Sequence, residues 1–221
     1  MADACRRLHA RGLLAGAEGN ISVRLPDGSL LVTPSGVDKA EITASDILHL
    51  HSDGTAYHAG TLAGESSVNR RDIARRPSSE LGMHRACYDA RTDVFAVVHA
   101  HPPAATGLGT AGQTLPADVL PELPVIVGPV AMVPYGRPGT PALGEAMAPF
   151  LRGHDAFLLA NHGVTTVGGT LKEALLRLET VEQAARILVV ARLLGGERRL
   201  EPDEARALAS LRTGPESSFN E

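Results

Sequence analysis

The sequence predicts an α/β domain built around a largely antiparallel or mixed β-sheet. Short apolar runs flank turn residues such as the Pro-Asp-Gly at 26–28, a pattern typical of β-hairpins. Helical patterns lie between and after these runs, and the hairpins favour this sheet over a doubly wound parallel one. The chain has 221 residues, which is long enough for one sizeable core and short for two. We therefore expect a single domain over residues 1–221.

The N-terminal half predicts a short helix followed by two hairpins. The helical pattern extends to about Leu14 and ends near Gly12 or Gly16, and the runs on either side of the 26–28 turn form the first hairpin. Residues 46–60 predict a strand, a Ser-Asp-Gly turn and a second strand. Residues 61–76 are polar, basic and glycine-bearing, which predicts an irregular loop.

The next helix is predicted to begin directly after Pro77. Ser78 and Ser79 are its candidate N-caps, and Glu80 falls in its first turn. The apolar run at 93–101 then predicts a buried strand. This strand ends where two prolines follow, because proline cannot donate to a sheet ladder.

The C-terminal half continues the alternation of strands and helices. Its last strong element is a long helix with Thr170 and Glu173 in a capping-box pattern and apolar residues at helical spacing. Further apolar residues lie off this stripe and need burial against the sheet or another subunit. The expected elements are a short helix from 102 to 109, one or two strands within 122–136, a helix at 140–153, a strand, turn and strand at 156–168, and the long helix at 170–196.

Composition and charge exclude several classes of function. The net charge of −4 leaves no basic surplus to neutralise the phosphates of a nucleic acid, and we interpret the one basic stretch, residues 69–77, as a solvated loop. We see no secretory signal and no run near the roughly 20 apolar residues of a membrane span. Cys5 and Cys87 are too few for a disulfide framework. We expect a cytoplasmic protein with reduced thiols and no nucleic-acid or membrane partner.

Two histidines stand at the end of the predicted buried strand. Residues i and i+2 of a strand point to the same face, so His99 and His101 lie side by side and can converge on one metal ion. Pro102 and Pro103 end the strand at this pair, where a cleft can form. Two hydrogen-bonded histidines at a strand end are the alternative interpretation, and the pair alone leaves both open.

A third histidine favours the metal site. His162 follows another apolar run and precedes a glycine that permits a sharp turn. Three neutral imidazoles with an open fourth position are typical of catalytic zinc, although Co²⁺, Mn²⁺ or iron suit the same residues. Such a cation can polarise a carbonyl or hold an enediolate. His84, four residues after Glu80 on one helix face, is a candidate supporting partner.

The Pro-Ser-Ser-Glu segment at 77–80 suggests an anion site and a base. A helix N-terminus offers free N–H groups and partial positive charge, and two serine hydroxyls add donors that suit a phosphate. Glu80 could act as general base beside the metal, although helix capping alone also explains this segment. Two further turns offer N–H or amide donors from Asn20, Ser35 and Gly36.

Together these motifs resemble the class II aldolase/adducin-head family, whose members include sugar-phosphate aldolases and epimerases. The resemblance covers about Leu8 to Arg192 and rests on "GNIS", "TPSG", "PSSE…H", "HAHP" and "NHG", which occur in the family's order. It implies a three-layer α/β/α fold with a central mixed, mainly antiparallel sheet. It also implies a homotetramer with active sites at subunit interfaces.

The resemblance also implies residue roles and a reaction. Glu80 matches the carboxylate that binds the resting metal and becomes the proton-transferring base. The implied reaction is zinc-dependent retro-aldol cleavage of a ketose 1-phosphate, of the fuculose-phosphate type, to dihydroxyacetone phosphate and an aldehyde. The matching zinc ligands are His99, His101, His162 and Glu80, and the matching phosphate-binding positions are Asn20, Ser35, Gly36, Ser78 and Ser79.

Two alternatives and one departure accompany this interpretation. The same metal site could serve a decarboxylase, dehydratase or epimerase on a sugar phosphate or related hydroxy-carbonyl acid, whereas an adducin-like scaffold needs no metal site. The glutamate after the two serines resembles the aldolase branch. Fuculose-phosphate aldolases use tyrosines after the His-x-His strand and near the C-terminus, and this chain has no match for them. The acid for the leaving alkoxide is therefore unassigned, with Asp118 and Glu122 as candidates.

Overall fold

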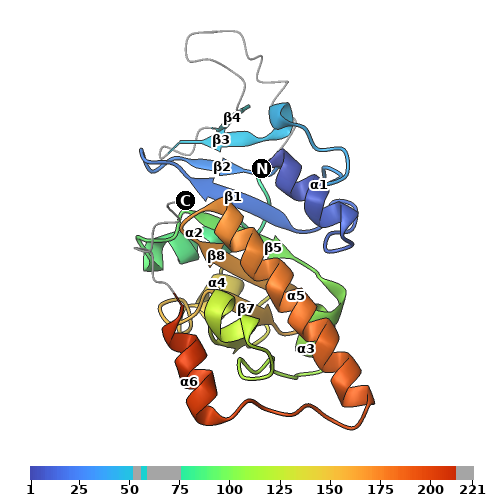
Figure 1. Ribbon diagram of the computed structural model, residues 1–221. Helices are drawn as coiled ribbons and strands as arrows, with labels where there is room; N and C mark the ends of the chain where they lie inside the picture. Colours follow the sequence, from blue (N-terminus) through green and yellow to red (C-terminus); the bar gives the residue numbers. More distant parts are fainter. Residues whose placement is uncertain (52–55, 59–75, 213–221) are drawn as a thin grey trace, which may run out of the picture.

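The computed structural model describes residues 1–51, 56–58 and 76–212. Within these residues eight strands form one sheet, in the order β4-β3-β2-β1-β5-β8-β7-β6 (Figure 1). All neighbouring strands are antiparallel except β6 and β7, which are parallel. The sheet is therefore mixed and mainly antiparallel, as predicted. The strands are β1 Asn20–Arg24, β2 Leu30–Val32, β3 Leu48–Leu50, β4 Ala56–His58, β5 Ala96–Ala100, β6 Val130–Val133, β7 Ala156–Leu159 and β8 Gly163–Gly168.

Helices cover both faces of this sheet, which confirms the three-layer α/β/α arrangement. On one face α1, α3 and α5 pack over a core that includes Val98 and Leu158, and on the other α2 and α4 pack over Val97 and Phe157. The helices are α1 Ala2–Ala10, α2 Leu81–Ala90, α3 Pro103–Thr110, α4 Pro141–Met147, α5 Leu171–Leu193 and α6 Pro202–Ser210, with short turns η1 Ala44–Asp46 and η2 Leu123–Val127.

Strand β5 lies near the middle of the sheet and is buried along its whole length. Its residues alternate between the two cores, so Val98 faces the α5 side, whereas Val97 and His99 face the α2 side. The period-2 pattern of the sequence thus directs His99 to the layer that contains α2.

Three neighbouring strands bring distant parts of the sequence to one end of the sheet. Asn20 at the start of β1 pairs with His99 near the end of β5. Ala100, the last residue of β5, pairs with Val164 at the start of β8. Because these strands are antiparallel, the beginnings of β1 and β8 and the end of β5 lie together.

Local elements match the sequence in part. The first helix ends at Ala10, close to the predicted end at Gly12, where the chain adopts a left-handed conformation with φ of 68°. Of the one or two strands predicted within 122–136, one forms as β6, whereas residues 123–127 form one helical turn, closed by a hydrogen bond of 2.7 Å from the Gly128 amide to the Leu123 carbonyl. Helix α6 was not anticipated. The predicted turn at 52–55 and most of the loop at 61–76 lie outside the described residues.

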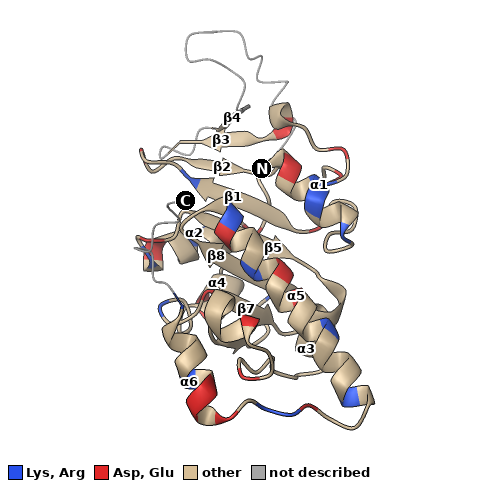
Figure 2. Ribbon diagram, viewed as in Figure 1, with Lys and Arg blue, Asp and Glu red and all other residues tan. Residues whose placement is uncertain are grey.

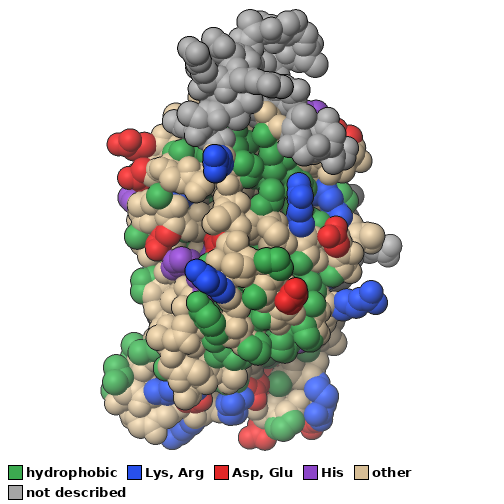
Figure 3. Space-filling view, turned by 180° about the vertical axis from the view of Figure 1, so that it is seen from behind, with side chains coloured by type: hydrophobic (Ala, Val, Ile, Leu, Met, Phe, Trp, Pro, Cys, Tyr) green, Lys and Arg blue, Asp and Glu red, His purple; other side chains and the backbone are tan. Residues whose placement is uncertain are grey.

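Charges of both signs are interspersed on the surface. Basic and acidic residues both lie on α1, α5 and α6 (Figure 2), and on the opposite side groups of hydrophobic residues are separated by charged ones (Figure 3). None of the helices in the described ranges has the length and apolar character that a membrane span requires.

Candidate metal centre

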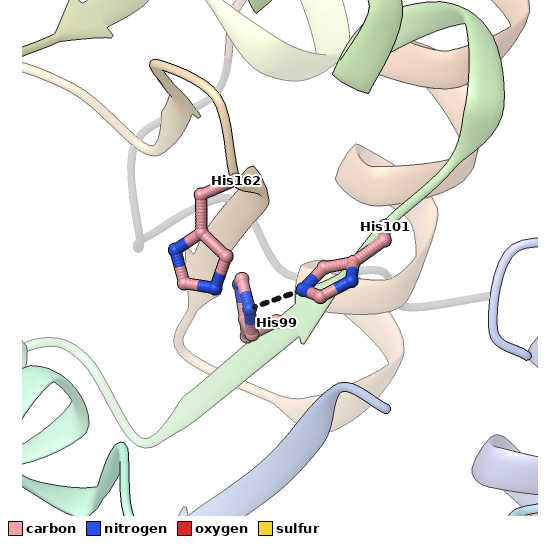
Figure 4. A group of neighbouring side chains, drawn as sticks. All are labelled: His99, His101 and His162. Carbon is pink, nitrogen blue, oxygen red and sulfur yellow. Dashed lines mark hydrogen bonds between the residues drawn. The ribbon is translucent and has the colours of Figure 1, made fainter. Parts of the chain in front are cut away.

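Three histidines converge at the end of the sheet where β1, β5 and β8 meet. His99 lies in β5, His101 follows it directly, and His162 lies in the turn between β7 and β8. Their rings point toward one another in Figure 4, with centroid separations of 4.7 to 5.1 Å. One ligand nitrogen from each lies within 4.8 Å of the other two. This geometry could hold a metal ion.

Hydrogen bonds set the tautomers of two of these rings. Nδ1 of His99 lies 3.0 Å from the carbonyl oxygen of Val164, which can only accept, so this nitrogen is the one that carries the proton. Nδ1 of His101 lies 3.1 Å from the Glu18 carboxylate and donates for the same reason. Nε2 of each ring, in its neutral form, therefore has a free lone pair. Burial lowers the pKa of His99 to about 3 despite the nearby Glu80 charge, which keeps that ring neutral.

These lone pairs are the observation that fits a cation. Nε2 of His99 and Nε2 of His101 face each other at 3.1 Å. For a tetrahedral ion with metal–nitrogen bonds of 2.0–2.1 Å, the nitrogens would be about 3.3 Å apart. Two lone pairs and a carboxylate so close together repel one another unless a positive charge lies between them. The donor set of neutral imidazoles with one carboxylate suits zinc and related divalent ions.

Glu80 brings a carboxylate to the histidines from the N-terminus of α2. It occupies the N-cap position, one residue before the predicted first turn. Its Oε1 lies 3.0 Å from Nε2 of His162, and its Oε2 lies 3.5 Å from Nε2 of His99. Oε1 is buried and has no hydrogen-bond partner in the described chain. Burial raises the pKa of Glu80, but His162, His99 and the Asn20 amide lower it by a larger amount. The net effect is a pKa of about 2, so the side chain is an anion.

The glycine of the Asn-His-Gly turn makes room for the cluster. A Cβ on Gly163 would lie 2.5 Å from Cδ2 of His101 and 2.6 Å from the Ala100 carbonyl oxygen. Asn161 adopts φ of 56°, a left-handed conformation that asparagine tolerates better than most residues. The turn therefore needs these two residue types to place His162 against the rings of β5.

A buried chain of hydrogen bonds supports Glu80. Nδ2 of Asn20 donates to Oε2 of Glu80 at 2.7 Å and to Oγ of Ser78 at 2.9 Å. Oδ1 of Asn20 accepts from Nε2 of His84. Nδ1 of His84 consequently accepts from the Ser22 hydroxyl at 2.6 Å. The pKa of His84 is lowered to about 4 by burial, so the ring is neutral. His84 thus supports Glu80 through Asn20 rather than by direct contact.

The predicted phosphate-binding turns lie next to each other. Pro34 and Pro77 form an isolated antiparallel bridge, and the Ser35 amide donates to the Arg76 carbonyl at 2.8 Å. This joins the Thr-Pro-Ser-Gly turn at 33–36 to the Pro-Ser-Ser-Glu segment at 77–80. Asn20 differs from the other predicted residues because it is buried and its amide hydrogens already bind protein oxygens. The other four predicted phosphate-binding residues are exposed or half-buried. They are Ser35, Gly36, Ser78 and Ser79.

Several sequence candidates lie apart from this centre. Asp118 forms an ion pair with Arg199, and Glu122 is exposed before η2. Neither contacts the histidines within the described residues. The Tyr88 hydroxyl is buried against Ser22 at 2.7 Å, and Tyr135 is 60% exposed. No contact of the described chain therefore supplies the missing acid.

Sequence reasoning missed Glu18, whose carboxylate lies 3.1 Å from Nδ1 of His101. It stands in the Glu-Gly-Asn turn before β1, two residues before Asn20, which the sequence did indicate. No local pattern marks Glu18 as a partner of a histidine 83 positions later. Only the pairing of β1 with β5 brings the two together.

Two cavities differ in their relation to the centre. One of about 500 Å³ lies between α2 and α4 and is lined by Ser79 and Glu80. A larger one, about 590 Å³, surrounds Asp155 at the other end of the sheet. Three of its four arginines form ion pairs with that carboxylate, namely Arg91, Arg177 and Arg212.

Comparisons with known proteins identify the family of this chain. The family described as Class II Aldolase and Adducin N-terminal domain matches residues 1–189. A 3-oxo-tetronate 4-phosphate decarboxylase of Escherichia coli strain K12 is 32% identical over 207 residues, which cover 92% of this chain and 89% of the relative. A 5-deoxy-D-ribulose 1-phosphate aldolase of Bacillus thuringiensis serovar kurstaki is 33% identical over 206 residues, with coverage of 92% and 89%.

Solved structures show the same fold. An L-fuculose 1-phosphate aldolase matches with a TM-score of 0.81 and 31% identity, covering 95% of this chain and 92% of that one. The relatives therefore share a fold and act on phosphorylated substrates, according to their names, but differ in the reaction.

Proposed function

The chain belongs to the class II aldolase and adducin family, as the resemblance in its sequence predicted, and on this basis we propose that it is a metal-dependent aldehyde-lyase. The proposed reaction is retro-aldol cleavage of a ketose 1-phosphate to dihydroxyacetone phosphate and an aldehyde. The observation that supports it best is the pair of Nε2 atoms, of His99 and His101, that face each other at 3.1 Å beside the Glu80 carboxylate. An adducin-like scaffold has no need of such an arrangement.

The proposed metal ligands are His99, His101, His162 and, in the resting state, Glu80. Zinc is the ion we propose, with Co²⁺ or Mn²⁺ as substitutes. When bound, the cation supplies positive charge that polarises the C2 carbonyl and offsets the charge that develops on the substrate's C2 and C3 oxygens.

Glu80 is the proposed proton-transferring residue. When the C3–C4 bond breaks, its electron pair stays on C3, and C4 leaves as an aldehyde once its hydroxyl has lost a proton. Glu80, which is an anion in the resting site, takes up a proton from water and delivers it to C3 to give dihydroxyacetone phosphate, which balances the proton lost from the C4 hydroxyl. Its hydrogen bond from Asn20 holds one carboxylate oxygen, at 2.7 Å, while Oε1 has no hydrogen-bond partner in the described chain. The residue that takes the C4 hydroxyl proton stays unassigned.

The phosphate is proposed to bind where the two bridged turns meet. Backbone N–H groups and hydroxyls at a helix N-terminus suit a phosphate dianion, and the Pro34–Pro77 bridge places both turns at the start of α2. The structure favours a supporting role for Asn20, because its amide already binds Glu80 and Ser78. The proposed phosphate ligands are Ser35, Gly36, Ser78 and Ser79, with Asn20 as the fifth sequence candidate.

A decarboxylase is the second candidate. Loss of carbon dioxide from a 3-oxo acid leaves the same kind of enolate. Unlike aldol cleavage, it does not require a residue that removes a proton from a C4 hydroxyl. This suits a site where neither Tyr88 nor Tyr135 contacts the described histidines, and it matches the activity for which the relative that is 32% identical is named. Dehydration or epimerisation would use the same cation and base.

The experiment that tests the proposal begins with metal analysis of the purified protein. The zinc-loaded protein is then incubated with a panel of 1-phosphorylated ketoses and with a 3-oxo acid 4-phosphate, while dihydroxyacetone phosphate and carbon dioxide are measured. We expect dihydroxyacetone phosphate from a ketose and its loss after chelation. Carbon dioxide release alone would favour the decarboxylase. A protein that takes up no metal after zinc supplementation would favour the scaffold.

A homotetramer with active sites between subunits and a cytoplasmic location complete the proposal. Apolar side chains near the end of α5 are exposed on the single chain, among them Leu193 at 81% and Leu194 at 83%. Burial of these side chains against another subunit would remove their apolar area from water.

A further inference from the structure

Glu18 contacts one of the three histidines of the candidate metal centre, His101. Its Oε2 accepts from Nδ1 of His101 at 3.1 Å, and its Oε1 accepts from the Ala15 amide at 2.9 Å. Both carboxylate oxygens are therefore occupied by donors that fix the side chain. The side chain is 34% exposed and that of His101 is 25% exposed, so this hydrogen bond lies at the rim of the site.

The turn that carries Glu18 is built against the histidine strand. Gly19 has φ of 66°, and a Cβ there would lie 2.7 Å from the carbonyl oxygen of His99. The close approach of this glycine fixes the distance between the turn and β5. The position of Glu18 beside His101 is therefore set by backbone packing, and not only by its own rotamer.

The three histidines differ in what supports their second nitrogen. Nδ1 of His99 is anchored by the Val164 carbonyl, and Nδ1 of His162 is buried without a hydrogen-bond partner in the described chain. Only His101 has a carboxylate in this position. A carboxylate behind a metal-binding imidazole selects the tautomer, orients the ring and makes its other nitrogen a better donor.

We propose that Glu18 is a positioning residue of the metal centre, which holds His101 with its proton on Nδ1 and its lone pair toward the ion. Its charge also brings a second carboxylate to the centre, so that Glu18 and Glu80 together balance a divalent cation. The inference rests on the metal dependence of the proposed function, but not on which bond the protein breaks.

The test uses two substitutions, Glu18→Gln and Glu18→Ala. An effect on the His101 tautomer and an effect of lost side-chain volume predict opposite orders of zinc affinity for them. In Glu18→Gln the amide oxygen can keep the Ala15 hydrogen bond, which turns the NH₂ group toward Nδ1 of His101. That ring must then accept at Nδ1 and carry its proton on Nε2, the nitrogen that faces the metal. In Glu18→Ala no donor opposes the ring, and water can accept from the partly exposed His101.

The affinity for zinc is measured by competition with a chromophoric chelator, together with the visible absorption spectrum of the Co²⁺-loaded protein. We expect Glu18→Gln to bind zinc about 10- to 100-fold more weakly than the wild type, with Glu18→Ala between them. The Co²⁺ spectrum should change in both. Glu41→Gln, which removes an exposed carboxylate, is the matched control and should bind like the wild type.

A purely structural role for Glu18 gives the reverse order, because Gln replaces the side-chain volume that Ala lacks. Zinc binding by Glu18→Gln at wild-type affinity, or more weakly by Ala than by Gln, overturns the proposal. A wild type that binds zinc but cleaves none of the substrates contradicts the proposed function alone. Melting temperatures of the metal-free variants show that both are folded.

Discussion

Replacing Gly163 with alanine should disable the metal centre through crowding by one methyl group. The new Cβ would lie 2.5 Å from Cδ2 of His101 and 3.2 Å from Cε1 of His99, and 3.4 Å is where ordinary contacts begin. The Ala100 carbonyl oxygen would also lie 2.6 Å from this Cβ, so retreat of His101 alone does not relieve the crowding, and the turn must move by up to about 0.9 Å. Metal sites tolerate deviations of about 0.2 Å in ligand distance, so the displacement is several times larger than the centre can absorb.

The expected result has two parts. Affinity for zinc should fall by more than the roughly 10- to 100-fold that loss of a supporting partner costs. Overpacking should also lower the free energy of unfolding of the metal-free protein by about 1–3 kcal/mol. The backbone of Gly163 does not have a positive φ, so alanine introduces crowding without strain of the main chain.

Chelator competition measures the first quantity and urea unfolding the second. The control is Gly107→Ala, in the interior of α3, where a Cβ would meet nothing within 4 Å. It should bind zinc normally and gain up to about 1 kcal/mol, because alanine is the better helix former. Normal zinc affinity in Gly163→Ala would refute the argument that this glycine is required by the packing of the histidines.

Three further predictions concern the same site. Glu80→Gln should keep the fold but lower turnover by about 10²- to 10⁴-fold, and activity within tenfold of the wild type would exclude Glu80 as the base. Burial lowers the pKa of His84 to about 4, so protonation favours the unfolded chain; the free energy of unfolding should fall by at most about 3 kcal/mol as the pH drops from 6.5 to 4. Urea titrations across this range should show a smaller slope in His84→Gln, and an equal slope would contradict the assignment. Zinc at 100 times the wild-type Kd should stabilise the metal-free protein by about 2.7 kcal/mol, measured by thermal unfolding. An equal gain in His162→Ala at the same zinc concentration would place the ion elsewhere.

The arrangement of the histidines was the part of the site that local sequence rules could predict. Strand periodicity places His99 and His101 on one face, and in the structure their Nε2 atoms lie 3.1 Å apart, although β5 itself ends at Ala100. The Asn-His-Gly turn predicted a sharp change of direction at His162, and its left-handed Asn161 provides one. These features depend on neighbours in the sequence, which is why the residues alone suffice to indicate them.

The contacts between segments had no such local signal. Glu18 reaches His101 only because β1 pairs with β5, and the order of strands in a sheet is a property of the whole chain. Similarly, the valines and isoleucine at 125–127 predicted a strand, but Pro124 in the first turn and Gly128, with φ of 79°, close the segment into a helical turn. Turn chemistry outweighed the preference of β-branched side chains there.

The meeting of β1, β5 and β8 at one end of the sheet has a mechanical consequence. An ion held by His99, His101 and His162 would link the end of β5 to the turn that leads into β8. Glu18 and Asn20 connect the start of β1 to the other side of β5. Loading the site should then slow amide hydrogen exchange across all three strand ends at once, including residues that never touch the metal.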